Sequence, residues 1–162
     1  PGKEVARLRA VRVRTSDGRS EEAFDIRKPV GIEMEYEVLK PGYKFAPFIE
    51  LWNEEGVCLI DSIEYDPNWR GRVRPPGHYR STAWIPGNYL AEGTLFVSVC
   101  LQTVDPKIRQ FYEKQVVAFT VVDNFEGDSA RVDFAGKLRG VVRPLLAWNT
   151  ELNAEGIQGE CV

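Results

Sequence analysis

The residues of this chain that could carry out covalent chemistry do not form a recognised catalytic motif. The segment 127–131, Gly-Asp-Ser-Ala-Arg, has the first glycine and the serine of a nucleophile elbow, but it ends in arginine and does not lie between a strand and a helix. The segment 136–140, Gly-Lys-Leu-Arg-Gly, has the glycines and lysine of a phosphate loop without the required spacing or the following serine or threonine. The only histidine, His78, has no obvious serine or cysteine partner. We therefore expect a non-catalytic protein whose function depends on its surfaces.

The cysteines and the single histidine also argue against a metal site. The sequence has three cysteines, Cys58, Cys100 and Cys161, and no two of them have the Cys-x-x-Cys spacing of a zinc site. Cys58 and Cys100 lie in strand-like stretches, where a free cysteine packs as a small apolar side chain. We expect reduced thiols, as in a cytoplasmic protein, rather than a structural disulfide, and we expect no metal, nucleotide or other cofactor.

Composition and charge exclude several functional classes. The chain has 162 residues, of which 43% are apolar and 28% charged, and this fits one globular domain of ordinary size. The net charge is -3 and both signs are spread along the chain, so we expect no broad basic surface and no nucleic-acid partner. No apolar run approaches the roughly 18 residues of a membrane span. The opening residues resemble the cut end of a longer protein rather than a signal peptide.

The most informative side chains are aromatic and polar residues that alternate with apolar ones. In the stretches 45–53 and 95–102, every second residue is apolar and belongs to the predicted core. The intervening residues should face outward, and they are Phe48, Glu50, Trp52, Phe96, Ser98, Cys100 and Gln102. Large aromatic rings on a wet face need a partner. Because rings stack on the C–H faces of sugars while polar neighbours bind hydroxyl groups, these residues are candidates for a carbohydrate site.

Two alternatives to a carbohydrate site stay open for these outward rings, since another strand or a second subunit could cover them.

Tyr65 and Trp69 lie in a long loop, residues 65–77, that is rich in proline, glycine and arginine. They could line an edge of the site, or they could pack down as anchors of the loop.

The stretch 30–38 predicts the central strand of the fold. Its apolar residues alternate without interruption with Glu33, Glu35 and Glu37, so one strand has a dry face and a wet face. The dry face requires a second layer to cover it, and the other apolar stretches alternate in the same way. We therefore expect an all-β sandwich.

The stretch 4–14 predicts the first strand, and its apolar residues change parity after Ala10, which indicates a bulge. Arg7 and Arg9 of this strand, with Arg80 as a further candidate, are expected to pair with the glutamates of the central strand. Opposite charges on neighbouring strands stabilise a sheet by roughly 0.2–1 kcal/mol per pair. This wet face is therefore interpreted as a solvated layer of ion pairs.

The strand-like stretches divide into two predicted sheets. One consists of 4–14, 30–38 and 78–85, and the other of 45–53, 57–62, 95–102 and 115–122, with a short additional strand near 24–26. Residues 106–114, between the stretches 95–102 and 115–122, form either a short helix or an irregular loop. Seven to nine strands with short turns are typical of an immunoglobulin-like β-sandwich of two antiparallel sheets.

The C-terminal part combines a long connection with a last apolar stretch. Residues 123–140 are polar with three glycines, and 141–150 predict one last strand that Pro144 confines to an edge. We expect one sandwich domain, residues 1–150, followed by a mobile polar tail, residues 151–162.

Two segments resemble motifs of a known family. Residues 84–95 read Trp-Ile-Pro-Gly-Asn-Tyr-Leu-Ala-Glu-Gly-Thr-Leu, and residues 140–148 read Gly-Val-Val-Arg-Pro-Leu-Leu-Ala-Trp. They resemble the Ile-Pro-x-Asn-x-Leu-x-x-Gly segment and the closing Val-Arg-Pro-x-x-x-Trp segment of the Wzt C-terminal domain family. That family is the carbohydrate-binding domain attached to the ATPase subunit of O-antigen polysaccharide ABC transporters. The hairpin at 53–56 fits as well, and Leu95 departs from the pattern where the family has tyrosine.

The resemblance implies a function, a location and partners. The domain would lie in the cytoplasm at the inner membrane, C-terminal to a nucleotide-binding domain, and would act with the membrane subunit of the transporter. It would recognise the modified end of a finished lipid-linked polysaccharide and admit it to export.

The resemblance also implies a homodimer made by exchange of the last strand. The apolar residues of that strand are Val141, Val142, Leu145, Leu146 and Trp148. The long connection before them can carry the strand to a second subunit at little extra entropy, because closure cost grows only with the logarithm of loop length. An alternative function stays open, in which the domain only dimerises the ATPase subunits and binds no small ligand.

Overall fold

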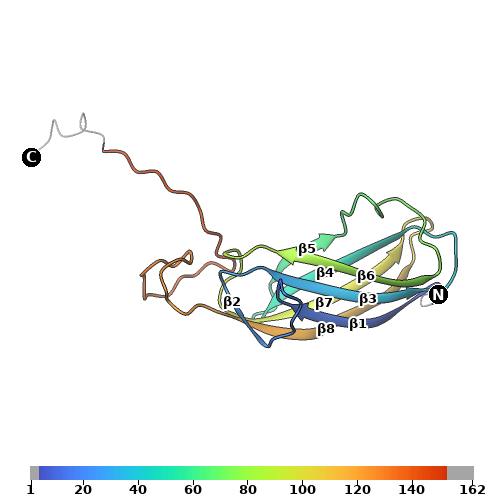
Figure 1. Cartoon of the computed structure of the whole chain (residues 1–162), viewed down its shortest axis with the longest axis horizontal. Helices are drawn as coiled ribbons and strands as arrows, with labels where there is room; N and C mark the ends of the chain where they lie inside the picture. Colours follow the sequence, from blue (N-terminus) through green and yellow to red (C-terminus); the bar gives the residue numbers. More distant parts are fainter. Residues whose placement is uncertain (1–3, 153–162) are drawn as a thin grey trace, which may run out of the picture.

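The computed structural model describes residues 4–152, and every regular element in that part of the chain is a β-strand (Figure 1). The strands are β1 (Ala6–Arg14), β2 (Ala23–Asp25), β3 (Val30–Val38), β4 (Phe45–Asn53), β5 (Cys58–Ile63), β6 (Gly77–Ile85), β7 (Gly93–Thr103) and β8 (Arg109–Val122). This confirms the all-β fold class. Across the described residues there is no helix of the length and apolar character needed to span a membrane. Most of the predicted tail, residues 153–162 with Cys161, lies outside the described residues.

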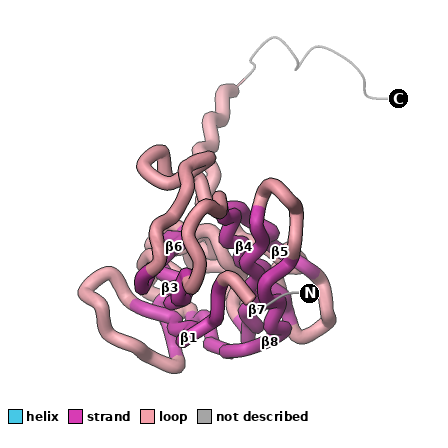
Figure 2. Tube along the Cα trace, turned by 90° about the vertical axis from the view of Figure 1, so that its right-hand side faces the viewer, coloured by secondary structure: helices cyan, strands magenta, loops and turns pink. Residues whose placement is uncertain are grey.

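The strands form two sheets, which Figure 2 shows end-on. The smaller sheet has the order β1-β3-β6, and the larger has the order β2-β8-β7-β4-β5. All neighbouring strands are antiparallel except β2 and β8, which are parallel. The division into two sheets is the one that the sequence predicts. β6 and β5 are each the last strand of a sheet, and residues of both line one cleft.

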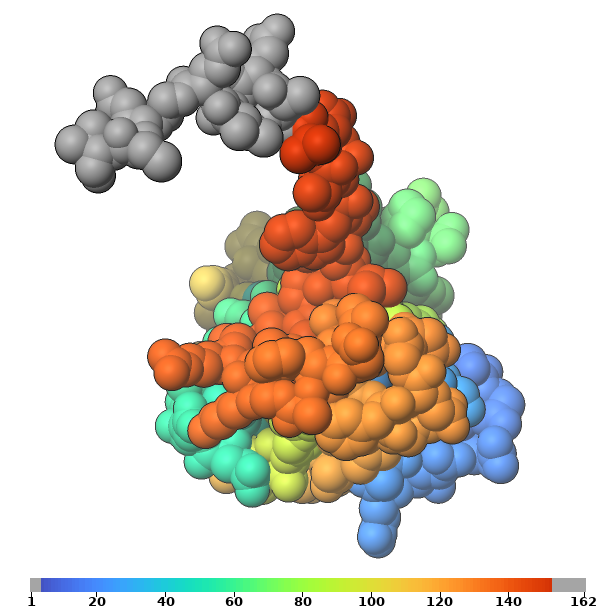
Figure 3. All heavy atoms as spheres, turned by 90° about the vertical axis from the view of Figure 1, so that its left-hand side faces the viewer, coloured from blue at the N-terminus to red at the C-terminus, as the bar shows by residue number. Residues whose placement is uncertain are grey.

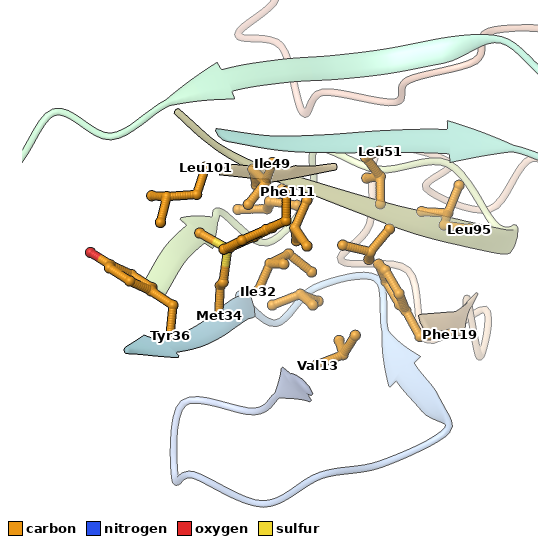
Figure 4. Packing of buried hydrophobic residues seen from close by; sticks show 14 of the residues in the cluster. Val13, Ile32, Met34, Tyr36, Ile49, Leu51, Leu95, Leu101, Phe111 and Phe119 are labelled. Atoms are coloured by element: carbon orange, nitrogen blue, oxygen red, sulfur yellow. The ribbon is translucent and has the colours of Figure 1, made fainter. Parts of the chain in front are cut away.

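Inward side chains of both sheets form one core (Figure 4). From β3 come Ile32, Met34 and Tyr36, which are fully buried. They face apolar side chains of the larger sheet, among them Ile49, Leu51, Leu101, Phe111 and Phe119. The apolar side chains of β3 all point to one face of the smaller sheet. Covering that face removes their surface from water, which stabilises the fold by roughly 25 cal/mol for each Å² of apolar surface buried.

The outer face of the smaller sheet is a layer of ion pairs that the sequence predicts only in part. The register of β1 against β3 shifts once, which confirms the bulge. Arg12 lies 3.1 Å from one oxygen of Glu33, Arg14 pairs with the other, and Arg80 adds a third guanidinium at 3.6 Å. The expectation of a wet Glu33 is therefore wrong. Its side chain is only 2% exposed because these arginines cover it.

The two remaining glutamates of β3 are partly exposed. Glu37 pairs with Arg9, as expected, and Glu35 accepts a hydrogen bond from Arg80 at 3.0 Å. Exposed pairs of this kind contribute at most about 1 kcal/mol each. Glu35 also pairs with Arg12 at 2.9 Å, so it helps to hold two of the three arginines beside Glu33.

The strand β8 begins at Arg109, well before the expected start at Gln115. A tight turn precedes it, in which the N–H of Thr103 donates to the carbonyl of Ile108 at 2.9 Å, and the N–H of Ile108 donates to Thr103 Oγ1 at 3.1 Å. These bonds tie the turn back to β7, so the short helix considered for residues 106–114 is wrong. Gln115 itself lies at a bulge of β8 and has a φ of 49°.

The expected last strand, residues 141–150, is not formed within the described chain. Val142 makes an isolated bridge to the segment before β7, and the N–H of Leu145 donates to the carbonyl of Asn88 at 3.0 Å. Pro144 between them has no N–H to continue a ladder. Beyond Leu145 the segment leaves the sandwich and projects from it (Figure 1).

The turn after β6 predicts a sharp cost for one substitution. A Cβ atom at Gly87 would overlap the carbonyl group of Arg27. The turn cannot easily move away, because the N–H of Asn88 donates to the carbonyl of Ile26 at 2.7 Å. We expect Gly87→Ala to lower the free energy of unfolding by about 1–3 kcal/mol, the usual cost of overpacking, as measured by urea denaturation.

Gly42→Ala gives the cost of backbone strain without overlap for comparison, whereas Gly87 has no positive φ and its substitution tests overlap alone. Gly42 has a φ of +93° and no atom within 4 Å of the added Cβ, so its substitution introduces only backbone strain. That strain costs about 1–2 kcal/mol. A Gly87→Ala protein as stable as the unmodified chain would show that the overlap is relieved by movement of the turn.

Candidate functional site

The outward side chains of the larger sheet lie in three neighbouring rows across β5, β4, β7 and β8. The first row is Cys58, Trp52, Phe96 and Ala118, the second is Asp61, Glu50 and Ser98, and the third is Ile63, Phe48, Cys100 and Tyr112. The alternate residues of the same strands, such as Leu51 and Val97, belong to the core. The register therefore places a polar row between two rows that contain aromatic rings. We call this surface the aromatic face.

Glu50 is the polar centre of the aromatic face. Its Oε2 atom accepts hydrogen bonds from the indole N–H of Trp52 at 3.0 Å and from the hydroxyl of Tyr112 at 2.7 Å. Within residues 4–152 no hydrogen bond reaches its Oε1 atom, so this oxygen can accept one from a ligand hydroxyl. The hydrogen bond to Glu50 is also the main reason why the pKa of Tyr112 is raised to about 12.

Ser98 and Cys100 form the floor of the aromatic face. Ser98 is 1% exposed, and its hydroxyl oxygen accepts a hydrogen bond from the backbone N–H of Gln115 at 3.0 Å. Ser98 therefore fixes the bulge of β8. Cys100 is buried too, and burial raises the pKa of its thiol. Among the polar groups predicted for this site, Glu50 and Gln102 are the partly exposed ones.

The aromatic rings of this face remain partly exposed. Phe48, Trp52 and Phe96 are half-buried, and none of them belongs to the hydrophobic core cluster. Gln102 lies at one end of the face, opposite Arg109 on β8, and lines a hollow of about 360 Å³. The face thus presents ring surface and polar groups side by side, with a hollow at one end.

Tyr65 and Trp69 do not lie on the aromatic face. They belong to the loop between β5 and β6 and line the cleft between these strands. Tyr65 is 81% exposed, whereas Trp69 is half-buried and packs edge-on against Tyr79 with ring centroids 5.3 Å apart. The structure therefore divides the predicted site residues between two surfaces, and Trp69 also anchors its loop.

The sequence pattern does not identify two residues at these surfaces. Tyr112 falls in the stretch 106–114, and only a strand that starts at Arg109 places it outward on β8. Arg74 lies among other arginines in a loop, and no local signal distinguishes it from them. Its side chain is nevertheless 1% exposed.

The two segments that carry the family resemblance meet in space. Glu92, from the first segment, accepts hydrogen bonds from the guanidinium groups of Arg131 and Arg143, each at 2.8 Å. The N–H of Arg143, from the second segment, also donates to the carbonyl of Tyr89 at 2.8 Å. Both arginines are buried, which strengthens such charged hydrogen bonds. They hold residues 123–143 over one end of the sandwich, where Figure 3 shows these residues in orange.

The residues expected at a dimer interface are mostly exposed in the single chain. Val142 is half-buried at its bridge, whereas Val141, Leu145 and Leu146 are exposed and Trp148 is 87% exposed. Apolar side chains gathered in this way on an extended segment are typical of a surface that contacts a partner.

The described residues contain no group of three or more His, Cys, Asp or Glu side chains arranged to hold a metal ion. The cysteines of this part, Cys58 and Cys100, are both free thiols, the first exposed and the second buried.

Comparison with known proteins finds a structural similarity and no match in sequence. No family model matches the chain, and none of the curated proteins does. The solved structure of the C-terminal domain of Wzt has a TM-score of 0.64 and 14% sequence identity, over 94% of this chain and 86% of that one. An ApaA protein from Bordetella pertussis has a TM-score of 0.29 and 13% identity, over 76% of this chain and 98% of that one. The first similarity shows that the chain shares the fold of the Wzt domain.

The hydrogen bond between Tyr112 and Glu50 predicts an unusual titration. Glu50→Gln removes the carboxylate that raises the pKa of Tyr112 from 10 to about 12, so we expect the pKa to fall toward 10. Because the folded-state pKa is raised, this bond stabilises the fold fully below pH 10, and the stability is lost as the pH rises through about 12. Ultraviolet absorbance of phenolate measures the titration. Tyr112→Phe identifies the step, and a step that persists in this variant would contradict the assignment.

Proposed function

We propose that this chain is a non-catalytic carbohydrate-binding domain that recognises the terminally modified end of a lipid-linked O-antigen polysaccharide for export by an ABC transporter. The observation that supports this most directly is the aromatic face, where rows with aromatic rings flank the carboxylate of Glu50. The fold shared with the C-terminal domain of Wzt agrees with it, because the motifs of the sequence resemble the same family.

Sugars suit the aromatic face because each sugar ring has both apolar and polar surface. The C–H face of a pyranose can stack on Trp52 or Phe96, which are neighbours across β4 and β7. A hydroxyl group of the same sugar can donate to Oε1 of Glu50. The hydrogen bond to Glu50 already orients the indole of Trp52, so little conformational freedom is lost on binding.

The proposed setting is the cytoplasmic side of the inner membrane, within a longer ATPase subunit. In the full-length protein a nucleotide-binding domain would precede this one, and the membrane subunit of the transporter would be its partner. Binding of the modified end would couple completion of the glycan to its export. This setting is supported by the resemblance of segments 84–95 and 140–148 and by the shared fold.

Dimerisation is a second function, and the exposed C-terminal segment, residues 141–148, favours it. We propose that this segment adds to a sheet edge of a second copy and forms a two-fold dimer by strand exchange. Its contact residues are Val141, Val142, Leu145, Leu146 and Trp148. Glu92 anchors the segment at Arg143, so Leu145, Leu146 and Trp148 beyond the anchor would cross to the partner, while Val141 and Val142 would lie beside the crossing point. A domain that only dimerises the ATPase subunits is the alternative, and it leaves the aromatic face without a role.

Trp52→Ala tests the binding face. We expect the affinity for O-polysaccharide fragments, released by mild acid from a panel of bacterial lipopolysaccharides, to fall up to about tenfold, since an aromatic contact contributes roughly 0.5–1.5 kcal/mol. The free energy of unfolding should fall by less than about 1 kcal/mol, because the indole lies outside the core. Calorimetric titration and urea denaturation measure the two quantities.

Trp148→Ala is the matched control, because it removes an exposed tryptophan from the C-terminal segment. With short fragments that cannot bridge two subunits, its affinity should equal that of the unmodified chain. A stability loss of several kcal/mol in Trp52→Ala, on the scale of buried aromatic truncations, would place the indole in the core. If Trp52→Ala leaves the affinity for fragments unchanged, the indole is not part of the binding site.

Truncation tests the exchanged strand. A chain that ends at Pro144 keeps the contact between Arg143 and Glu92 but lacks Leu145, Leu146 and Trp148. We expect it to be a monomer by light scattering, whereas a chain that ends at Leu152 remains a dimer. A dimeric truncated chain, or a full chain that is monomeric at micromolar concentration, is the result that excludes strand exchange.

A further inference from the structure

A cleft of about 460 Å³ lies between the edge strands β5 and β6, where the two sheets end. In the end-on view of Figure 2, these strands belong to opposite layers. The loop that connects them contributes Tyr65 and Trp69 to the lining. The volume lies within the range of sites for small molecules.

A buried guanidinium group forms part of the cleft. Arg74 lines it, and its side chain is 1% exposed. The group donates hydrogen bonds to the hydroxyl of Tyr36 and to the carboxylate of Glu64. It also lies 5.6–5.8 Å from the ring centroids of Tyr36, Trp69 and Tyr79. These contacts fix the position of the arginine before any ligand arrives.

One strong donor of this group lacks an acceptor. The Nε atom of Arg74 is buried and has no hydrogen-bond partner among the described residues. The charge of the group is balanced by Glu64, which in turn accepts a hydrogen bond from the hydroxyl of Ser81 at 2.9 Å. Because Glu64 already neutralises the guanidinium group, this pair leaves no net charge at the cleft, and the cleft suits an uncharged ligand.

The cleft is continuous with the aromatic face. Ile63 belongs to the third row of that face and also lines the cleft. Ile63 and Glu64 both line the hollow at Gln102 as well. A path of contiguous surface therefore leads from the aromatic face, past β5, into the cleft. Tyr65 lines the cleft beside this path as a highly exposed ring, with the guanidinium of Arg70 over it at 5.4 Å.

We propose that the cleft is a second carbohydrate subsite, which takes a neutral sugar residue of the glycan whose end binds on the aromatic face. The proposal rests on the proposed function and extends it. Glu64 and Ser81, which are partly exposed at the cleft, supply polar groups for hydroxyl groups, and Tyr65 supplies a ring for stacking. The domain then recognises the chain at a distance from its modified end, and affinity depends on chain length as well as on the end group.

Length-fractionated fragments of the O-polysaccharide that binds best on the panel test this subsite. We expect the affinity of the unmodified chain to rise about tenfold once the fragments reach from the aromatic face to the cleft. Tyr65→Ala should remove most of this gain while leaving the affinity for short fragments unchanged. In amide NMR spectra, only long fragments should shift residues 62–65 and 79–83. Tyr89→Ala, which removes another exposed tyrosine, is the matched control and should keep the gain.

The outcomes separate the subsite from the proposed function. Equal affinities for long and short fragments, or a gain that survives Tyr65→Ala, would overturn the subsite and leave the aromatic face as the binding site. Ser81→Ala gives a second reading, since it changes the hydrogen bonding of Glu64 and should reduce the gain for long fragments only. If neither short nor long fragments bind, the proposed function fails and the subsite fails with it.

Discussion

The burial of the inward side chains of β3, and of Glu33 on its outer face, is the constraint on which the rest of the structure depends. Its inward side chains, such as Tyr36, require a second sheet to cover them. Its outward Glu33 requires positive charges over it, because a buried carboxylate without partners is strongly unfavourable. The strand must therefore be the middle one of its sheet. β1 lies on one side and supplies Arg12 and Arg14, and β6 lies on the other and supplies Arg80.

The unequal width of the two sheets accounts for the cleft, and the strand register of the wider sheet accounts for the aromatic face. Three strands cover only part of five, and β1 and β8 are in contact at one border. At the other border β5 and β6 flank a cleft, and the buried charge of Arg74 and the rings around it line this cleft. The aromatic face follows from the register of the larger sheet, which aligns outward side chains of β5, β4, β7 and β8 in rows with Glu50 in the central one. The cleft follows from the packing of a narrow sheet on a wide one.

The C-terminal segment shows how anchoring and exposure are separated along the chain. Glu92 holds Arg131 and Arg143 in partly buried hydrogen bonds, and removing one partner of such a pair is costly. Beyond this anchor, Leu145 and Trp148 are exposed within the described chain. Both segments that carry the family resemblance contribute to this anchor, the first through Glu92 and the second through Arg143. The contact holds the fold together, so these two residues carry information about the fold and little about the ligand.

Local alternation by itself determined most of the strands and the bulge of β1, because the parity of a strand is a property of neighbouring residues. The order of these stretches along the chain predicted their division into two sheets. The same parity placed Trp52 and Phe96 opposite the core. Tertiary structure decided the rest. Glu33 is buried because register aligns arginines of two other strands over it, and Tyr112 reaches Glu50 only because β8 starts at a turn that no periodicity reveals. Arg74 enters the interior through the folding of its loop. For Glu33 and Tyr112 the deciding partners are distant in sequence and strand register brings them together, whereas loop closure places Arg74 against Tyr36 and Glu64.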